Sequence, residues 1–324
     1  MNSNETLAQY SDWAFRSAFA VLVLALVLLI VQYASKRARS VQEKELVTAG
    51  GSPQATSASV PGRVIDQPKK PLGDRFGGMG AAVLIVGVVL TFASIVLRGF
   101  ATSRFPLGNM YEFVTMACGA ALVVALIFLW KPAYRSMWAF VLVPVLILMF
   151  LAGTVLYSDA APVVPALRSY WLPIHVTIVS VGSGVFLVAG VASLLFLLRM
   201  RYPDGAEGKG FLARVAERLP DAQTLDRLAY KTTIIGFPLF GAGVILGAIW
   251  AEAAWGRFWG WDPKETVSFI AWVIYAAYLH ARATSGWRDT RAAWINVAGF
   301  VAMLFNLFII NMVVSGLHSY AGLN

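Results

Sequence analysis

The chain has 324 residues, of which 58% are hydrophobic and only 13% are charged. Soluble domains carry about 25% charged residues, so the composition excludes an ordinary soluble enzyme and indicates an integral membrane protein. The formal net charge of +9 comes mostly from basic residues in alternate loops. This pattern reflects membrane topology, so it does not predict nucleic acid as a partner.

The chain contains eight apolar segments that reach or approach the roughly 20 residues needed to span a membrane. They predict an all-α integral membrane protein with about eight transmembrane helices. The seventh segment is the shortest and has the weakest support from hydropathy. The predicted spans are residues 14–33, 78–98, 111–130, 136–156, 173–199, 232–251, 266–281 and 293–314.

The first apolar segment differs from a signal peptide. Its basic cluster, Lys36 to Arg39, follows the apolar run, and no small-residue cleavage site is evident. We therefore predict a retained N-terminal transmembrane helix within residues 1–39. Residues 40–77 include a small, polar run from Gly50 to Ser59, which predicts a flexible cytoplasmic linker. Residues 78–324 are expected to form a seven-helix core.

The placement of lysine and arginine orients the predicted helices. Twenty of the 26 basic residues fall in alternate loops, which the positive-inside rule assigns to the cytoplasm. Both termini are then extracytoplasmic, and the chain is expected to be a multi-pass protein of the plasma membrane. The cytoplasmic loop of about residues 200–231 contains the stretch 210–218. The apolar positions Phe211, Leu212, Val215 and Leu219 recur there at helical spacing, which predicts a short helix on the inner membrane surface.

The most distinctive segment is the outer loop of residues 250–265, which is rich in tryptophan. Gly256 and Gly260 let its backbone turn, so several rings can line one surface. Aromatic faces stack on large planar ligands, whereas the aromatic belt of a membrane interface is usually more scattered. We therefore predict a ligand platform made of Trp255, Phe258, Trp259 and Trp261.

The same loop ends in the sequence Asp262-Pro-Lys-Glu265, which is typical of a capping box. Aspartate at the N-cap, proline at the first helical position and glutamate at the third start a helix. Asp262 or Lys264 can also meet a polar edge of the ligand, and the sequence leaves this open.

Two of the three histidines, His175 and His318, are predicted at the outer boundary, on the same side as the tryptophan-rich loop. Neutral imidazole is a good ligand of haem iron, and two imidazoles can bind opposite faces of one haem. The alternative is two interfacial histidines that hydrogen-bond water. Because the aromatic loop lies beside them, we predict that both are axial ligands.

The third histidine, His280, lies 17 residues beyond Pro263. This spacing is about 25 Å along a helix, which predicts a position near the inner leaflet. An ionisable residue within the membrane is a functional candidate. A haem at His280 is then five-coordinate or takes its second ligand from a partner protein. The alternative is a histidine that snorkels beside Arg282.

Two features of the third span also bear on function. Asn109, Tyr111 and Glu112 form a polar cluster at its outer end, which either braces the ligand site or caps the helix. Cys118 lies within the span and is expected to be a small core residue. Because the chain has one cysteine, it cannot carry out dithiol exchange by itself.

These motifs resemble those of the CcsA/ResC family of system II cytochrome c maturation, within a wider haem-handling superfamily. The resemblance is dense over the C-terminal third and extends into the middle of the chain, whereas the first helix and the linker do not contribute. The matching segments are Trp255–Glu265, Thr224–Tyr230, Gly247–Glu252, Tyr278–Arg282, Gly316–Ala321, Trp171–Val176 and Leu107–Glu112.

The resemblance implies haem b (protohaem IX) as the cofactor, with His175 and His318 as external axial ligands. It implies that His280 lies on the haem uptake route and that a ResB-type membrane subunit supplies the histidine opposite it. Asp262 joins the loop aromatics in the implied haem platform. The implied supporting residues are Trp171, Trp250, Glu252, Asn109 and Glu112.

The function that the resemblance implies is haem delivery within a cytochrome c synthase. Such a subunit moves haem b outward and presents it at the outer membrane face for thioether attachment to the Cys-x-x-Cys-His motif of apocytochrome c. A separate thiol-reducing protein keeps these cysteines reduced. Whether the chain catalyses attachment is left open. The alternatives are a haem exporter or chaperone without a role in attachment, a bis-histidine cytochrome b, and a permease, whose inverted repeats are not visible.

Overall fold

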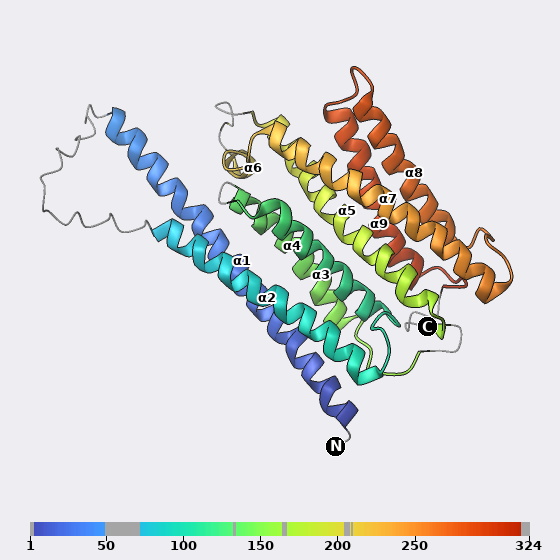
Figure 1. Cartoon of the computed structure of the whole chain (residues 1–324). Coiled ribbons are helices and arrows are strands. Elements are labelled where there is room, and N and C mark those ends of the chain that lie inside the picture. The colour runs from blue at the N-terminus through green and yellow to red at the C-terminus, as the bar shows by residue number, and fades with distance from the viewer. Residues whose placement is uncertain are drawn as a thin grey trace, which may run out of the picture.

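The computed structural model describes residues 3–48, 72–131, 134–163, 167–203, 208 and 210–318, and the regular structure within these ranges is helical (Figure 1). The helices are α1 (Ser3–Thr48), α2 (Leu72–Thr102), α3 (Met110–Leu129), α4 (Arg135–Thr154), α5 (Trp171–Arg201), α6 (Phe211–Ala216), α7 (Ala222–Trp255), α8 (Pro263–Ala283) and α9 (Thr290–Met312).

The long helices coincide with the predicted spans, which confirms the all-α membrane fold with about eight transmembrane helices. Seven helices are long and apolar enough to cross a membrane, and α8 is the long helix outside that set. It contains the seventh predicted span, and its ends carry Lys264, Glu265 and Arg282, which shorten its apolar part. The short helix predicted for residues 210–218 is present as α6.

Several helices extend beyond their predicted apolar segments. α1 continues to Thr48 and α2 begins at Leu72, so both ends of the expected linker, residues 40–77, are helical. Residues 49–71 lie outside the described part of the chain. Hydropathy marks the length of helix that suits lipid, and it does not mark where the helix ends in polar surroundings.

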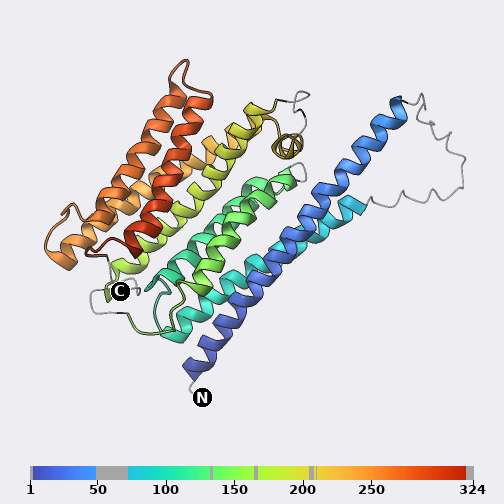
Figure 2. The same cartoon turned by 180° about the vertical axis from the view of Figure 1, so that it is seen from behind.

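The helices pack side by side in one bundle (Figures 1 and 2). α1 pairs with α2 at one edge and also contacts α4, while α3 lies against α4 and α5. α5 contacts α7 and α9, and α8 packs against these two at the opposite edge. One continuous apolar core includes Leu22 of α1, Leu122 of α3 and Phe186 of α5, so the first helix shares the core of the others.

The alternating direction of the long helices brings four segments to the same end of the bundle (Figure 1). These segments are residues 103–109, 155–163, 256–262 and 313–318, and α1 begins at this end as well. We call it the site end. The loops predicted on the outer side therefore gather together, and the distribution of basic residues predicts that they are extracytoplasmic.

The close crossing of α3 and α5 depends on Gly184. A Cβ atom at this position would lie 2.6 Å from the Ala117 carbonyl oxygen and 2.7 Å from the Ala121 nitrogen. Small residues let membrane helices approach closely in this way. The crossing matters for function because α5 also carries His175 at the site end.

We predict that Gly184→Ala lowers the free energy of unfolding by about 1–3 kcal/mol, because the added methyl group forces α3 and α5 apart. Gly78→Ala is the matched control, since a Cβ atom at Gly78 of α2 meets nothing within 4 Å. Unfolding curves of the purified protein in detergent provide the measurement. Equal stability of the two variants would contradict the close approach of α3 and α5.

Candidate functional site

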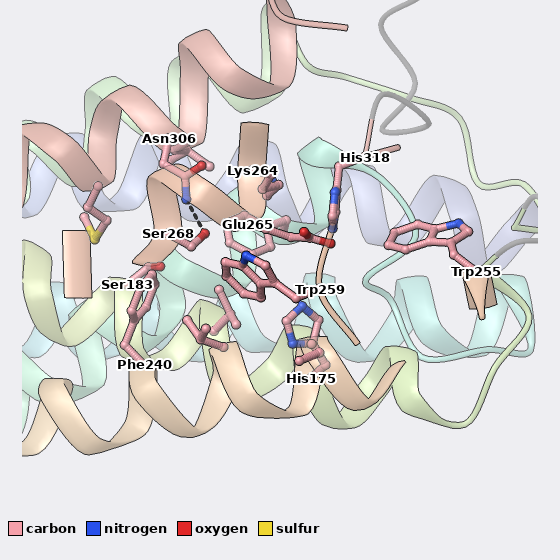
Figure 3. A pocket seen from close by; sticks show the side chains of 17 residues that line it. His175, Ser183, Phe240, Trp255, Trp259, Lys264, Glu265, Ser268, Asn306 and His318 are labelled. Atoms are coloured by element: carbon pink, nitrogen blue, oxygen red, sulfur yellow. Dashed lines mark hydrogen bonds between the residues drawn. The ribbon is translucent and has the colours of Figure 1, made fainter. Parts of the chain in front are cut away.

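A hollow at the site end lies between α5, α7, α8 and α9 (Figure 3). Its empty volume is about 770 Å³, a figure that includes open solvent at the mouth. A second hollow of about 590 Å³ adjoins it on the side of α3. His175, Lys264 and His318 are among the residues that line both hollows, so they lie at the boundary between them.

His175, near the start of α5, is held by the backbone of α7. Its Nδ1 atom lies 2.8 Å from the carbonyl oxygen of Gly243. Because a carbonyl oxygen can only accept, Nδ1 carries the proton and Nε2 is the unprotonated nitrogen that can bind a metal. The ring approaches α7 closely because Gly247 has no side chain; a Cβ atom there would lie 2.7 Å from Cε1 of His175.

His318, in the C-terminal segment, is held by Asp262. Its Nδ1 atom lies 2.7 Å from Oδ2 of Asp262, and Oδ1 accepts a hydrogen bond from the Leu317 nitrogen at 2.7 Å. Burial alone raises the pKa of Asp262, but hydrogen bonds from His318, Leu317 and the Lys264 nitrogen lower it to about 2. The carboxylate is therefore ionised at neutral pH. In the neutral imidazole, Nδ1 then donates and Nε2 is the unprotonated nitrogen that can bind a metal, as in carboxylate–histidine pairs at metal sites.

The tryptophan-rich loop is organised by the Glu265 side chain. Its carboxylate accepts hydrogen bonds from the Gly260 and Asp262 nitrogens at 2.9 and 3.1 Å, and it pairs with Arg257 at 3.3 Å. Asp262 caps α8, which confirms the predicted capping box. At the end of α7, Gly256 adopts the left-handed conformation with φ 71°, which favours glycine. The loop is thus a closed turn between α7 and α8.

Two of the four predicted platform aromatics line the hollow. Trp255 and Trp259 do so, and Trp255 packs edge-to-face on His318 with ring centroids 5.3 Å apart. The exposed fractions of Trp261 and Phe258 are 68% and 60%. Trp261 has a left-handed backbone with φ 57° and lies, with Trp259, at a separate apolar hollow between α7 and α8. Two indoles therefore form the loop's contribution to the site.

Lys264 lines the hollow, whereas Asp262 serves the helix cap and His318. The Lys264 Nζ atom donates a hydrogen bond to Oδ1 of Asn311 on α9. The sequence left open which of the two residues meets the ligand, and the geometry favours Lys264. A cation in the first turn of a helix is unfavourable beside the positive end of the helix dipole, and this is the signal that marks Lys264 in the sequence.

His280 lies apart from this site. It is exposed in the last turn of α8, at the end of the bundle opposite the site end (Figure 1). It lines neither of the two hollows that contain His175 and His318. The structure therefore brings together two of the three predicted haem ligands and leaves the third at a separate depth.

Two of the three predicted supporting residues on α5 and α7 pack near His175. Trp250 is buried and packs edge-to-face on His175, with ring centroids 5.8 Å apart. Trp171 packs against the apolar cluster that contains Trp250. Glu252 is exposed and lines neither hollow. Two of these three residues thus support the site by packing.

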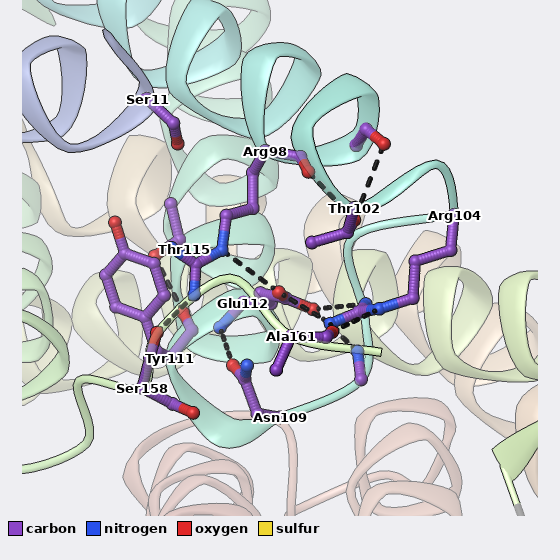
Figure 4. Close-up of polar contacts among 12 residues, drawn as sticks. Ser11, Arg98, Thr102, Arg104, Asn109, Tyr111, Glu112, Thr115, Ser158 and Ala161 are labelled. Carbon is purple, nitrogen blue, oxygen red and sulfur yellow. Dashed lines mark hydrogen bonds and ion pairs between the residues drawn. The ribbon is translucent and has the colours of Figure 1, made fainter. Parts of the chain in front are cut away.

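Glu112 is the centre of a buried ion cluster at the site end (Figure 4). Its carboxylate pairs with Arg98 at 3.2 Å and with Arg104 at 2.8 Å, and it accepts a hydrogen bond from the Gly108 nitrogen at 2.7 Å. Asn109 caps α3 by accepting a hydrogen bond from the Glu112 nitrogen at 2.9 Å. Gly108 and Asn109 line the second hollow. The predicted polar cluster therefore caps α3 and braces one wall of the site.

Arg98 connects this cluster to the N-terminal helix. Its guanidinium donates a hydrogen bond to the Ser158 carbonyl oxygen and lies 3.5 Å from Asp12 of α1. The other oxygen of Asp12 accepts a hydrogen bond from the Tyr157 hydroxyl at 2.7 Å. Sequence reasoning missed the role of Arg98 because these partners are distant along the chain.

The chain is similar to proteins of cytochrome c assembly. The sequence profile of the family described as cytochrome C assembly protein matches residues 107–318. This range contains all the residues that line either hollow. A cytochrome c biogenesis protein CcsA of Synechococcus is 32% identical over 272 residues, which cover 76% of this chain and 87% of that protein. The CcsA protein of Guillardia theta is 34% identical over 241 residues, with coverages of 70% and 80%.

A similar fold occurs in the solved structure of the cytochrome c haem lyase CcmF, with a TM-score of 0.62 at 17% identity. The match covers 93% of this chain and 46% of the lyase, so the chain spans about half the length of that protein. At this level of identity, the similarity concerns the fold alone.

We predict that Glu112→Gln lowers the free energy of unfolding by about 3–5 kcal/mol, because two arginines then lose their shared buried carboxylate. Glu252→Gln removes an exposed carboxylate and is the matched control, with an expected change within about 0.5 kcal/mol. Denaturation followed by tryptophan fluorescence measures both. An unchanged stability of the Glu112 variant would show that the cluster does not brace this end of the bundle.

Proposed function

The chain belongs to the cytochrome c assembly protein family, in its CcsA/ResC group, and we propose that it holds haem b at the site end between His175 and His318. Its general role, like that of its relatives, is in cytochrome c biogenesis, and it is a multi-pass membrane protein. The proposal adds the ligand, the residues that hold it, and the side of the membrane on which it is presented.

One observation carries the proposal. The imidazoles of His175 and His318 line the same two hollows. Nδ1 of His175 contacts the Gly243 carbonyl oxygen, and Nδ1 of His318 contacts the Asp262 carboxylate. In a neutral imidazole that donates from Nδ1, Nε2 is the unprotonated nitrogen, which is the form that binds haem iron. Within the described residues, no group of three or more histidine, cysteine and acidic side chains is arranged to hold a bare metal ion.

The residues of the site hold and orient the haem. His175 and His318 bind the iron, Trp255 and Trp259 offer indole faces to the porphyrin, and Asp262 keeps His318 in the ligating tautomer. When bound, haem supplies the vinyl groups to which the thiols of apocytochrome c add. Holding it in a fixed position lowers the entropic cost of that encounter, so positioning is the main contribution of the chain.

The partners follow from what the chain lacks. Its single cysteine, Cys118, is buried, so a separate protein must keep the Cys-x-x-Cys-His thiols of apocytochrome c reduced. His280 is exposed at the opposite end of the bundle, where we assign it to haem uptake. A ResB-type membrane subunit supplies the second iron ligand there. The basic residues orient the site end toward the outside of the plasma membrane.

A cytochrome b that carries electrons across the membrane is less well supported. Such a protein needs pairs of histidines near both membrane surfaces. His175 and His318 can form one pair at the site end, and His280 remains single because the chain has three histidines. Haem delivery requires one pair of histidines at the outer site. It also requires the single His280, opposite which a partner protein supplies the second iron ligand.

We predict that His175→Ala and His318→Ala each abolish the low-spin bis-imidazole spectrum and the maturation of cytochrome c, because each variant removes one axial ligand. Added imidazole is expected to restore the low-spin spectrum by binding in the space that the side chain leaves. Absorption spectra of the chain purified without its ResB-type subunit provide the measurement, because a haem at His280 has a second imidazole ligand only when that subunit is present. Levels of c-type cytochrome in cells measure maturation. Wild-type spectra and maturation in both variants would refute the assignment of the pair.

We predict that Asp262→Ala weakens haem binding by about 10–100-fold, because His318 loses the carboxylate that orients it. The matched control is Asp221→Ala, which removes the N-cap of α7 at the other end of the bundle. Haem titrations of the two variants separate the loss of a helix cap from the loss of the histidine partner. A similar affinity in both variants would contradict the role given to Asp262.

A further inference from the structure

Lys264 lines the hollow without an oppositely charged side chain in contact with it among the described residues. The nearby carboxylates have other contacts: Glu265 pairs with Arg257 at 3.3 Å, and Asp262 accepts a hydrogen bond from Nδ1 of His318 at 2.7 Å. Lys264 lines both hollows, yet no carboxylate of the described residues forms an ion pair with it. Burying part of an ammonium without an anionic partner is costly. The wall of the hollow therefore carries one positive charge that the described protein residues do not neutralise by contact.

Local structure does not account for this lysine. It lies in the first turn of α8, where the helix dipole disfavours a cation and where Asp262 and Glu265 already form the cap. A small polar side chain at this position would start the helix equally well. The lysine is better explained by an anionic ligand than by the helix it belongs to.

Asn311 fixes the position of the ammonium. Its Oδ1 atom accepts the hydrogen bond from Lys264, while its Nδ2 atom donates to the carbonyl oxygen of Leu307 at 2.6 Å. Asn311 is buried, so its amide has a single orientation in which both groups are used. The ammonium is thus held at the boundary between the two hollows, on the same boundary as His175 and His318.

We propose that Lys264, positioned by Asn311, binds a carboxylate of the porphyrin, namely a propionate of haem b. This assignment rests on the proposed function, in which the same hollow holds haem. An ammonium–carboxylate contact is a charge-assisted hydrogen bond and is stronger than a neutral one. In haem b, the propionates and the vinyl groups lie at opposite edges of the ring. A propionate at Lys264 therefore directs the reactive vinyl edge away from Lys264.

The test compares two ligands on the full chain in lipid nanodiscs. Protohaem IX and its dimethyl ester, in which both propionates are esterified, are titrated into the apo protein. The wild type is expected to bind protohaem about 10-fold or more tightly than the ester, as one hydrogen bond between charged groups implies. Lys264→Gln is expected to reduce this preference to about 2-fold or less, and Lys264→Arg to retain most of it.

Lys231→Gln is the matched control, because Lys231 is an exposed lysine of α7 far from the hollow in the fold. It is expected to keep the wild-type preference. Equal binding of the two ligands by the wild type overturns the proposal, and so does an unchanged preference in Lys264→Gln. If the glutamine variant does not fold, the wild-type comparison still decides the outcome.

The spectra in the same titrations separate this proposal from the proposed function. A bis-imidazole spectrum without any preference for free propionates leaves haem binding by His175 and His318 intact and rejects the role of Lys264. If neither ligand gives that spectrum in the wild type, the haem site itself is wrong, and the propionate assignment falls with it.

Discussion

The site depends on the contact between Asp262 and the C-terminal segment. One carboxylate accepts hydrogen bonds from the Lys264 nitrogen at the start of α8, from the Leu317 nitrogen and from His318 Nδ1. A Cβ atom at Gly316 would lie 2.7 Å from Oδ1 of Asp262, so glycine is needed for this close approach. The same side chain thus starts a helix, places the segment beyond α9 and sets the tautomer of the neutral His318 imidazole, a proposed iron ligand.

The opposite imidazole is held by packed helices. His175 donates to the Gly243 carbonyl oxygen, and small residues on α7 let α5 approach. At Gly243, a Cβ atom would lie 2.6 Å from Cγ2 of Val179, and at Gly247 it would meet the His175 ring. The site therefore combines one proposed ligand, His175, on a packed helix pair with another, His318, on a hydrogen-bonded segment. Its geometry requires both the α5–α7 packing and the Asp262 contact.

The sequence predicts well the features that depend on neighbouring residues in the chain or on the surrounding lipid. Lipid requires long apolar helices whatever they pack against, so hydropathy located the spans. The cap from Asp262 to Glu265 is formed within one turn and could be read directly. The exposure of Phe258 and Trp261 could not be predicted, because the direction of the rings depends on the backbone of the loop, which is left-handed at Gly256 and Trp261. The pairing of Arg98 with Glu112 depends on how α2 and α3 approach, which no local pattern encodes.

The most direct measurement is a cryo-electron microscopy map of the haem-loaded chain in its membrane complex. The account predicts one iron atom coordinated by Nε2 of both His175 and His318, with Trp255 and Trp259 beside the porphyrin. Iron coordinated by only one of these histidines, or bound at the site end by other side chains, would contradict it.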